Sequence, residues 1–226
     1  MTVPIMTIDG PSGSGKGTVA RAAAIALGWG LLDSGALYRL VALAGRRAHI
    51  GLEDGSGLAD LAANFDIRFG SDPGGEELVW LDGIEVTRDI RTEMAGNDAS
   101  KVAAIPAVRA ALLERQRRFA VAPGLVADGR DMGTVVFPEA QIKIFLTASP
   151  DERAQRRYKQ LKQKGVTANL AALSREIAER DQRDSTRAIS PLVASADAIS
   201  LDTTGMGVDE VIGRVLQIAR GRIARF

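Results

Sequence analysis

Glycines crowd around one lysine in the stretch GPSGSGKGT, which occupies residues 10–18. The spacing fits the pattern G-x-x-x-x-G-K, with Gly10, Gly15 and Lys16 at the defining positions. A loop that wraps around a phosphate must point successive backbone N–H groups inward, and glycine adopts the necessary conformations most readily. Lys16 supplies a mobile cation for terminal phosphates. The residues of this predicted phosphate-binding loop are Gly10, Pro11, Ser12, Gly13, Ser14, Gly15, Lys16, Gly17 and Thr18.

One position departs from the usual form of this motif. The residue after the lysine is normally Ser or Thr, whose hydroxyl binds Mg²⁺. Here Gly17 stands in that position and Thr18 comes next. The usual hydroxyl ligand of Mg²⁺ is therefore missing from its position, and the sequence leaves the direct metal contacts open.

Two further groups of polar residues follow apolar runs that are typical of strands. Ser34, Tyr38 and Arg39 come at or just after the end of WGLLDS, where ligands of open α/β sheets bind. Half-buried packing is the alternative interpretation of Tyr38. Asp128, Arg130 and Asp131 come at the end of LVAD, and an apolar strand ending in Asp is typical of a Walker-B carboxylate. Asp128 or Asp131 could orient Mg²⁺-bound water or pair with arginine, and the sequence does not separate the two.

The elements that must hold these residues alternate between strand and helix. Short apolar runs predict strands, and apolar periodicity followed by Gly28 predicts a helix that ends there. The alternation favours βαβ units and a parallel sheet. The predicted strands are 3–8, 29–34, 125–128, 142–148 and one within 196–204; the predicted helices are 16–27, 36–48, 89–121 with a break near Pro106, two stretches within 150–184 and 208–223.

A different pattern of apolar and polar residues interrupts this alternation of strands and helices at about residues 65–87. Phe65, Ile67 and Phe69 alternate with polar residues, and Asp82-Gly83 joins two apolar runs. Asp-Gly between apolar runs is a strong signal for a two-residue hairpin. We therefore expect a small antiparallel meander inserted into the α/β pattern.

Composition excludes several kinds of chemistry and of partner. The 226 residues are 46% hydrophobic and 25% charged. The net charge of +1 is too small to attract nucleic acid or an acidic membrane by the electrostatic field of the whole protein. The absence of cysteine excludes disulfides and thiolate chemistry, and His49 is the single histidine. The N-terminal run has no signal-peptide pattern, and no apolar run approaches the roughly 20 residues that span a bilayer. We expect a cytoplasmic monomer that binds neither nucleic acid nor membrane.

The loop GPSGSGKGT resembles that of nucleoside monophosphate kinases, in which GKGT is usual. Three further stretches, LLDSGALYR at 31–39, DGRDMGTVVFP at 128–138 and RDQRDSTRAISPL at 180–192, narrow the resemblance. Together with the hairpin they closely resemble bacterial cytidylate kinases over essentially the whole chain. This resemblance implies an α/β, three-layer P-loop nucleoside monophosphate kinase fold with a central five-stranded parallel sheet. It implies one domain, 1–226, with a β-rich monophosphate-binding insertion at about 63–100 and a helical lid at about 150–190.

The resemblance also implies a reaction and roles for individual residues. ATP with Mg²⁺ would phosphorylate CMP and dCMP, and Lys16, Arg130, Asp131 and Arg187 would be the catalytic residues. Ser34, Tyr38 and Arg39 would lie in the monophosphate site, while Ser100 and Arg109 would contact the cytosine edge. Without the resemblance, Ser100 and Arg109 read as ordinary residues of a helix surface. Asp184 would contact the ribose, and Arg180 and Arg187 would contact phosphates; most other arginines between 153 and 187 are interpreted as a solvated helix face.

Three alternative functions share parts of this pattern. Another small-molecule kinase, acting on UMP, dephospho-coenzyme A or shikimate, would keep the loop and the lid arginines but differ at Ser100, Arg109 and Asp184. A P-loop switch NTPase that reads guanine would need an N/T-K-x-D segment, which is absent. A nucleic-acid-binding module built on the basic stretch 153–164 would need interleaved aromatic residues and overall basicity.

Overall fold

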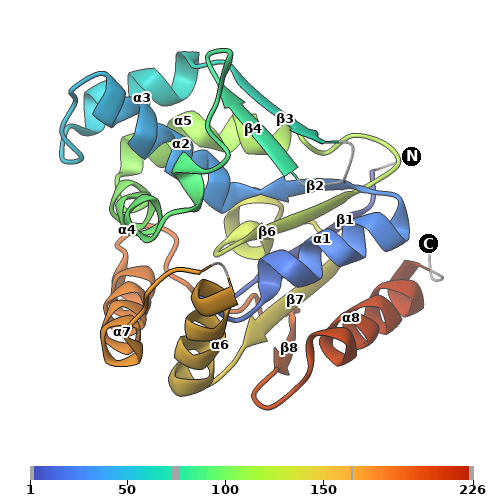
Figure 1. Cartoon of the computed structure of the whole chain (residues 1–226). Coiled ribbons are helices and arrows are strands. Elements are labelled where there is room, and N and C mark those ends of the chain that lie inside the picture. The colour runs from blue at the N-terminus through green and yellow to red at the C-terminus, as the bar shows by residue number, and fades with distance from the viewer. Residues whose placement is uncertain (1–2, 73–76, 164, 224–226) are drawn as a thin grey trace. The chain divides into compact units, whose positions relative to one another are not determined.

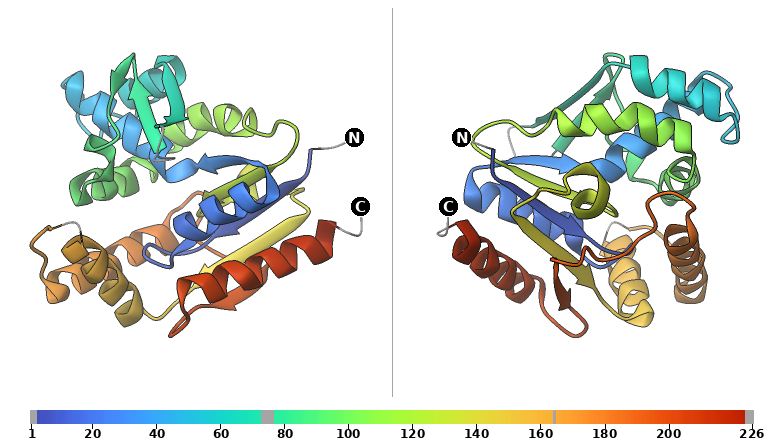
Figure 2. Two further views of the ribbon diagram at one scale, coloured as in Figure 1. Left: turned by 45° about the vertical axis from the view of Figure 1, so that its right-hand side comes forward. Right: turned by 180° about the vertical axis from the view of Figure 1, so that it is seen from behind.

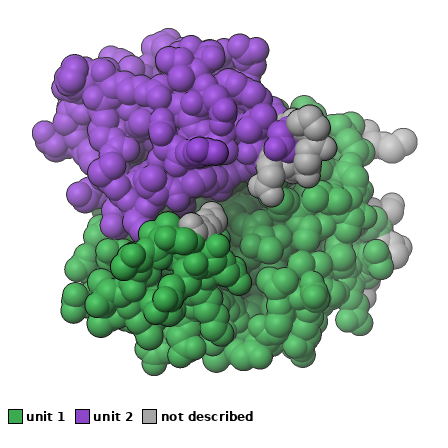
Figure 3. All heavy atoms as spheres, in the orientation of Figure 1, with its two compact units in different colours: residues 1–33, 116–226 green, residues 34–115 purple. Residues whose placement is uncertain are grey.

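The structure is a computed structural model that describes residues 3–72, 77–163 and 165–223. The chain divides into two compact units, one formed by residues 1–33 and 116–226 and the other by residues 34–115 (Figure 3). A sheet of five strands belongs to the first unit, and a sheet of three strands belongs to the second. The expected arrangement of one domain with an insertion and a lid stays a prediction.

The five-stranded sheet of the first unit is parallel throughout, with strand order β2-β6-β1-β7-β8 (Figure 1). β1 lies at its centre between β6 and β7, and every residue of β6 is buried. Near-continuous apolar runs are typical of parallel strands covered on both faces. The predicted central five-stranded parallel sheet is therefore confirmed. The strands are β1 (Ile5–Asp9), β2 (Gly30–Asp33), β6 (Leu125–Gly129), β7 (Ile142–Thr147) and β8 (Ile199–Asp202).

Helices pack on this sheet through small and branched apolar residues. α1 (Lys16–Leu27) and α8 (Val208–Ile223) contact each other, and they share a core with β1, β6 and β7 that includes Ile8, Val19 and Val215 (Figure 2). α6 (Pro150–Gln163) and α7 (Leu170–Thr186) pack side by side. Among the helices of the described residues, none combines the length and apolar character that a membrane crossing demands.

The strand register brings the polar strand ends together at one edge of the sheet. Asp9 of β1 aligns with Gly129 of β6, and Asp128 aligns with Asp33 of β2. The phosphate loop, the segment after β6 and the start of α2 therefore all leave from the carboxyl ends of neighbouring strands. This is the edge at which open α/β sheets bind ligands.

The second unit packs helices with a small antiparallel sheet. α2 contacts α3, α4 and the 3₁₀ turn η1, and ten of its residues are buried. The sheet has the order β3-β4-β5. The elements are α2 (Ser34–Arg47), α3 (Gly55–Asn64), β3 (Ile67–Ser71), β4 (Glu77–Leu81), β5 (Ile84–Glu85), η1 (Asp89–Arg91), α4 (Glu93–Val102) and α5 (Pro106–Arg117), the last of which ends in the first unit.

The hairpin predicted at Asp82-Gly83 is confirmed. Asp82 and Gly83 both adopt positive φ angles, 50° and 79°, between the antiparallel strands β4 and β5. Two positive φ angles in succession match the right-handed twist of the flanking strands. The predicted break before Pro106 is also present, between α4 and α5.

Two helical segments were not predicted from the sequence. The first three residues of α3, GSG, favour turns over helix. The helix nevertheless starts there because the Asp54 side chain caps it by accepting a hydrogen bond of 2.9 Å from the Gly57 amide. Residues Met132–Val136, which no predicted strand or helix includes, form one turn of π-helix, η2. Asp9, 123 residues earlier in the chain, accepts hydrogen bonds from the first amides of that turn, and a local pattern does not reveal such a partner.

Candidate active site

The phosphate loop runs from the end of β1 to the start of α1 and depends on glycine at specific points. Gly13 and Gly15 have φ angles of 78° and 89°, and a Cβ on Gly10 would lie 2.0 Å from the Leu146 carbonyl oxygen. Within the part of the chain that the structure describes, no side chain caps the first turn of α1, so its amide groups stay available. Backbone N–H groups at a helix N-terminus bind phosphate well. The predicted loop therefore has the conformation of an anion site.

Lys16 is buried at the start of α1, and its Nζ donates a hydrogen bond of 3.0 Å to the Pro11 carbonyl oxygen. Burial, and secondarily the nearby Arg130 charge, lower the pKa of Lys16 to about 7, although Asp128 and Asp184 oppose the change. A bound phosphate would restore the cation, because an opposite charge favours the protonated amine.

We expect nucleotide binding at pH 8 to take up close to one proton. Lys16, with a pKa of about 7, is mostly neutral at that pH in the free protein and becomes charged beside a triphosphate. Asp128, with a pKa of about 7, and the terminal phosphate, with a pKa of about 6, are already largely ionised and release little. Calorimetric titration with ATP in two buffers of different ionisation enthalpy measures the uptake. The control is Lys16→Arg, whose guanidinium is charged in both the free and the bound protein, so this variant should take up no proton. Equal binding enthalpies in both buffers for the unchanged protein would contradict the proton uptake by Lys16.

The structure separates the two aspartates that the sequence left undivided. Asp128 lies beside the loop: its Oδ2 is 3.2 Å from the position of a Cβ on Gly17, and its buried Oδ1 has no hydrogen-bond partner among the described residues. Burial raises the pKa of Asp128 to about 7, although the Lys16 charge opposes this. Asp131 is buried at the start of η2, where its charge acts on Asp9. Asp128 is thus the carboxylate next to the loop lysine.

The same geometry explains the glycine at position 17. We expect Gly17→Ser, which restores the usual hydroxyl, to lower about tenfold the kcat of the phosphoryl transfer that the resemblance implies. The added Cβ would crowd the Asp128 carboxylate and shift it. Gly17→Ala should behave alike, and Gly213→Ala on α8, where a Cβ meets nothing within 4 Å, is the matched control. Steady-state kinetics of the three variants measures the effect. A Gly17→Ser protein with unchanged kcat would show that the crowding has no consequence.

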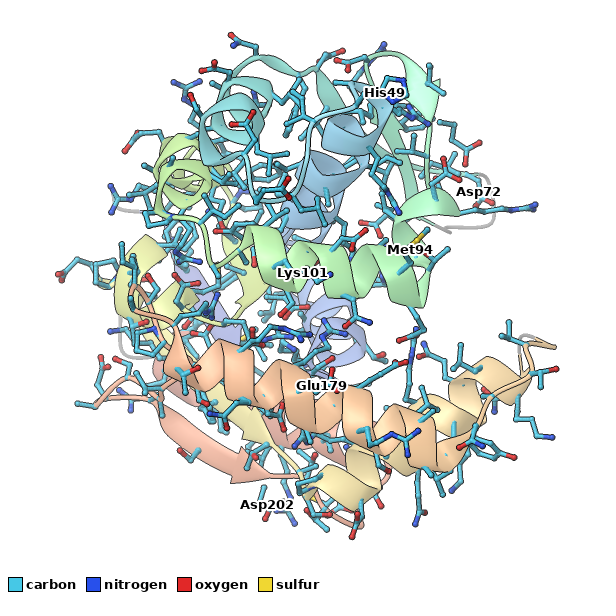
Figure 4. All side chains as sticks on the ribbon, turned by 90° about the vertical axis from the view of Figure 1, so that its left-hand side faces the viewer. His49, Asp72, Met94, Lys101, Glu179 and Asp202 are labelled. Atoms are coloured by element: carbon cyan, nitrogen blue, oxygen red, sulfur yellow. The ribbon has the colours of Figure 1, made fainter. Side chains whose placement is uncertain are left out.

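Basic residues of α7 and of the segment after β6 gather around Lys16. Arg130 Nε donates a 2.8 Å hydrogen bond to Asp184 Oδ2, and Arg187 Nε donates one of 3.4 Å to the Asp184 carbonyl oxygen. Burial alone would lower the pKa of Arg130, but the Asp184 carboxylate raises it above its ordinary value. Arg180 also contributes charge at Lys16 and at Asp184. Figure 4 shows the side chains of α7, with Glu179 labelled. The structure thus brings together the predicted residues Lys16, Asp128, Arg130, Arg180, Asp184 and Arg187.

Five of the predicted acceptor residues, Ser34, Tyr38, Arg39, Ser100 and Arg109, lie in the second unit, and most of these five are buried. Arg109 and Ser100 are 8% and 6% exposed, so interpreting them as ordinary helix-surface residues is wrong. The Arg109 guanidinium lies 5.9 Å from the centre of the buried Tyr38 ring and donates to the Ala103 carbonyl oxygen. Arg39 Nη1 donates a 2.8 Å hydrogen bond to the Ile90 carbonyl oxygen of η1. Ser34, the first residue of α2, is buried as well.

Sequence reasoning missed three polar residues of this region. Asp9 is buried and accepts 2.8 Å hydrogen bonds from the Met132 and Gly133 amides; burial raises its pKa to about 6, although these two bonds oppose the change. A polar residue that ends an apolar strand directly before the glycine loop was the available signal. Arg153, 3% exposed, and Arg156, which bonds to Thr203, do not belong to a solvated face. Nothing local distinguishes them from neighbouring arginines.

The glycine loop joins the central strand of a parallel sheet to α1, and a buried lysine and several arginines gather beside it. These features define the protein as a P-loop phosphotransferase of the nucleotide kinase type. Residues 6–221 match the family model described as cytidylate kinase. The chain is 57% identical over 215 residues to a cytidylate kinase of Stutzerimonas stutzeri, covering 95% of this chain and 94% of that protein. It is 55% identical over 222 residues to one of Klebsiella pneumoniae, covering 98% and 97%. The chain therefore belongs to the cytidylate kinase family.

A solved structure supports the fold alone. An uncharacterized protein from Eubacterium ventriosum matches with a TM-score of 0.53 and 13% identity, covering 97% of this chain and 99% of that one. At that identity the likeness concerns the arrangement of the elements and not the chemistry of the site.

Proposed function

We propose that the protein transfers the γ-phosphoryl group of ATP to CMP and dCMP, which yields ADP with CDP or dCDP. The observation that carries the proposal is the grouping of Lys16, Arg130 and Asp184 beside a phosphate loop, in a chain of the cytidylate kinase family. In this reaction an oxygen of the acceptor phosphate forms the new bond to the γ-phosphorus, and the bond from that phosphorus to the ADP oxygen breaks.

The attacking group explains why the site needs no general base. A phosphate monoester has a second pKa of about 6, so its oxygens are largely unprotonated at neutral pH. The protein must align two highly charged phosphates and screen their repulsion. In this proposal the loop amides and Lys16 hold the donor phosphates, and Arg130 and Arg187 stabilise the charge on the transferred group. Asp131, the residue after Arg130, would complete the catalytic group.

Residues of the second unit would recognise the acceptor. Arg39 would bind its phosphate beside Ser34 and Tyr38, while Ser100 and Arg109 would contact the cytosine ring. A hydroxyl acceptor and a guanidinium donor suit the amine, N3 and O2 of that edge. Asp184 would accept from the ribose, and Arg180 would reach the phosphates. The buried state of Ser100 and Arg109 supports specific contacts over solvent exposure.

The residues near the loop suit Mg²⁺ bound with the nucleotide. Mg²⁺ prefers oxygen ligands and commonly uses one or two carboxylates together with substrate phosphates and water. Beside Gly17, where the motif otherwise provides a hydroxyl, Asp128 has a buried oxygen that no group in the described part of the chain hydrogen-bonds. Asp128 would hold the ion or its bound water, and the ion would screen the negative charge of the phosphates.

The remaining parts of the proposal concern organisation and surroundings. We propose one catalytic domain in which residues 63–100 form a monophosphate-binding insertion and residues 150–190 a lid that excludes water. The partners would be small molecules and not nucleic acid or membranes, and the protein would act as a cytoplasmic monomer. The small net charge of +1 supports the absence of nucleic-acid binding.

The decisive experiment is a coupled assay of ADP release with ATP and Mg²⁺ against CMP, dCMP, UMP, AMP and GMP, with a reaction lacking acceptor as control. Release that depends on CMP or dCMP supports the proposal and ranks the two sugars. Release that follows UMP alone, or that needs no acceptor, would leave the phosphate loop in place and overturn the roles given to Ser100, Arg109 and Asp184.

A further inference from the structure

Two arginines of α6 contact the outer side of the phosphate loop. Arg153 Nη1 donates a hydrogen bond of 3.0 Å to the Ser12 carbonyl oxygen, and Arg156 Nη1 donates one of 3.4 Å to the Ser14 carbonyl oxygen. The contact is close, because a Cβ on Gly13 would lie 3.1 Å from the Arg153 Cβ. Arg153 is 3% exposed, so its guanidinium is held by protein groups and not by solvent.

The direction of these carbonyl groups determines where the loop amides point. In a planar trans peptide, the C=O of one residue and the N–H of the next point in opposite directions. When Arg153 holds the Ser12 carbonyl on the outer side, the Gly13 N–H is directed toward the inner side. Arg156 has the same relation to the Gly15 N–H through Ser14. These amides are the groups that a loop of this kind offers to an anion.

Arg153 also connects the loop to α7. Its Nη1 and Nη2 donate hydrogen bonds of 3.0 and 2.5 Å to the two carboxylate oxygens of Asp181, and its Nε donates one of 3.0 Å to the Ala148 carbonyl oxygen. Asp181 lies one helical turn before Asp184, the residue that pairs with Arg130. One guanidinium therefore fixes the loop, the end of β7 and the helix that carries Arg180, Asp184 and Arg187.

We propose that Arg153 is a positioning residue of the donor site, which keeps the phosphate loop in its anion-binding form and ties that form to α7 through Asp181. The inference rests on the proposed function only in taking a nucleoside triphosphate as the phosphoryl donor. A role in stability alone is a poor explanation, because well-packed apolar residues often replace buried ion pairs without loss of stability. Four hydrogen bonds from one planar group instead define a geometry, which lysine cannot reproduce.

The test measures binding of inorganic tripolyphosphate to the whole protein by titration calorimetry, which requires no acceptor. Arg153→Met removes the donors and keeps an apolar side chain, and we expect it to weaken binding about tenfold or more at a temperature where thermal denaturation shows the protein folded. Arg153→Lys keeps the positive charge but lacks the planar guanidinium with its several N–H donors, so its affinity should lie between those of Arg153→Met and the unchanged protein. Arg214→Met, which breaks the exposed Arg214–Glu210 pair on α8, is the matched control and should bind like the unchanged protein.

A second variant tests the link to α7. Asp181→Asn should weaken tripolyphosphate binding less than Arg153→Met, and the double variant should bind no more weakly than Arg153→Met alone, since both changes break one connection. Folded Arg153→Met or Arg153→Lys proteins with unchanged affinity would overturn the positioning role, and losses that multiply in the double variant would overturn the link. If Arg153→Met does not fold, Arg153→Lys and Asp181→Asn decide the question. Failure of CMP-dependent ADP release would overturn the proposed function without altering this comparison.

Discussion

Lys16→Met should lower CMP-dependent ADP release by about a thousandfold or more while the protein stays folded. Lys16 is the buried cation at the centre of the site, and its loss removes charge stabilisation where the transferred phosphoryl group must lie. Burial lowers the pKa of Lys16 to about 7 because its charged form is costly at this position, and an apolar side chain avoids that cost. We therefore expect the melting temperature without ligand to be unchanged or raised.

The measurement pairs single-turnover kinetics with thermal denaturation of the same preparation. Lys101→Met on α4, which removes an exposed lysine outside the proposed site, is the control and should keep full activity. A folded Lys16→Met protein that retains most of its turnover would refute the assignment of the phosphate loop.

Arg130→Ala should lower kcat by about a hundredfold to a thousandfold, whereas Arg109→Ala should act mainly on KM for the acceptor. Arg130 stands among the groups around Lys16, where charge would develop in the proposed reaction, and removing such a group lowers the rate of the chemical step. Arg109 is buried beside Tyr38 and Ala103, in the unit proposed to hold the base. Its loss should also reduce the preference for CMP over UMP, because discrimination between bases depends on hydrogen bonds to the ring edge.

Steady-state kinetics with ATP saturating and CMP or UMP varied separates these effects. Arg130→Lys serves as the companion variant, since it keeps a charge near Asp184 and should recover part of kcat. Equal losses of kcat in Arg130→Ala and Arg109→Ala would contradict the division of roles.

Local patterns in the sequence predicted most of the fold and the phosphate loop. The predicted strand ends at residues 8, 34 and 128 each lie one residue from the observed ends at Asp9, Asp33 and Gly129, and the hairpin follows from Asp82-Gly83. These features depend on neighbouring residues, so a reading along the chain detects them. The roles of Arg130, Asp184 and Arg187 required the family resemblance, because no spacing rule relates residues that lie 54 positions apart, as Arg130 and Asp184 do.

The features that escaped prediction depend on distant partners. The π-helical turn after β6 exists where Asp9 accepts bonds from residues 123 and 124 positions later. Arg153 sits in a run of basic residues, and only its contacts with Ser12 and Asp181 distinguish it from its neighbours. Burial of a charged side chain by remote elements leaves no periodic signal in the sequence around it.

The position of β1 at the centre of the sheet has a consequence for how the protein is made. The phosphate loop lies within the first 18 residues, yet β1 pairs with residues 125–129 and 142–145. Domains emerge from the ribosome N-terminus first, at about 5–20 residues per second, and contacts of long sequence separation form late. A nascent chain that ends before residue 125 has the complete loop sequence without either neighbour of β1. Although the loop residues are synthesised first, β1 gains both of its neighbours only after residue 145 is made, so we expect chains interrupted before residue 125 to lack the assembled loop.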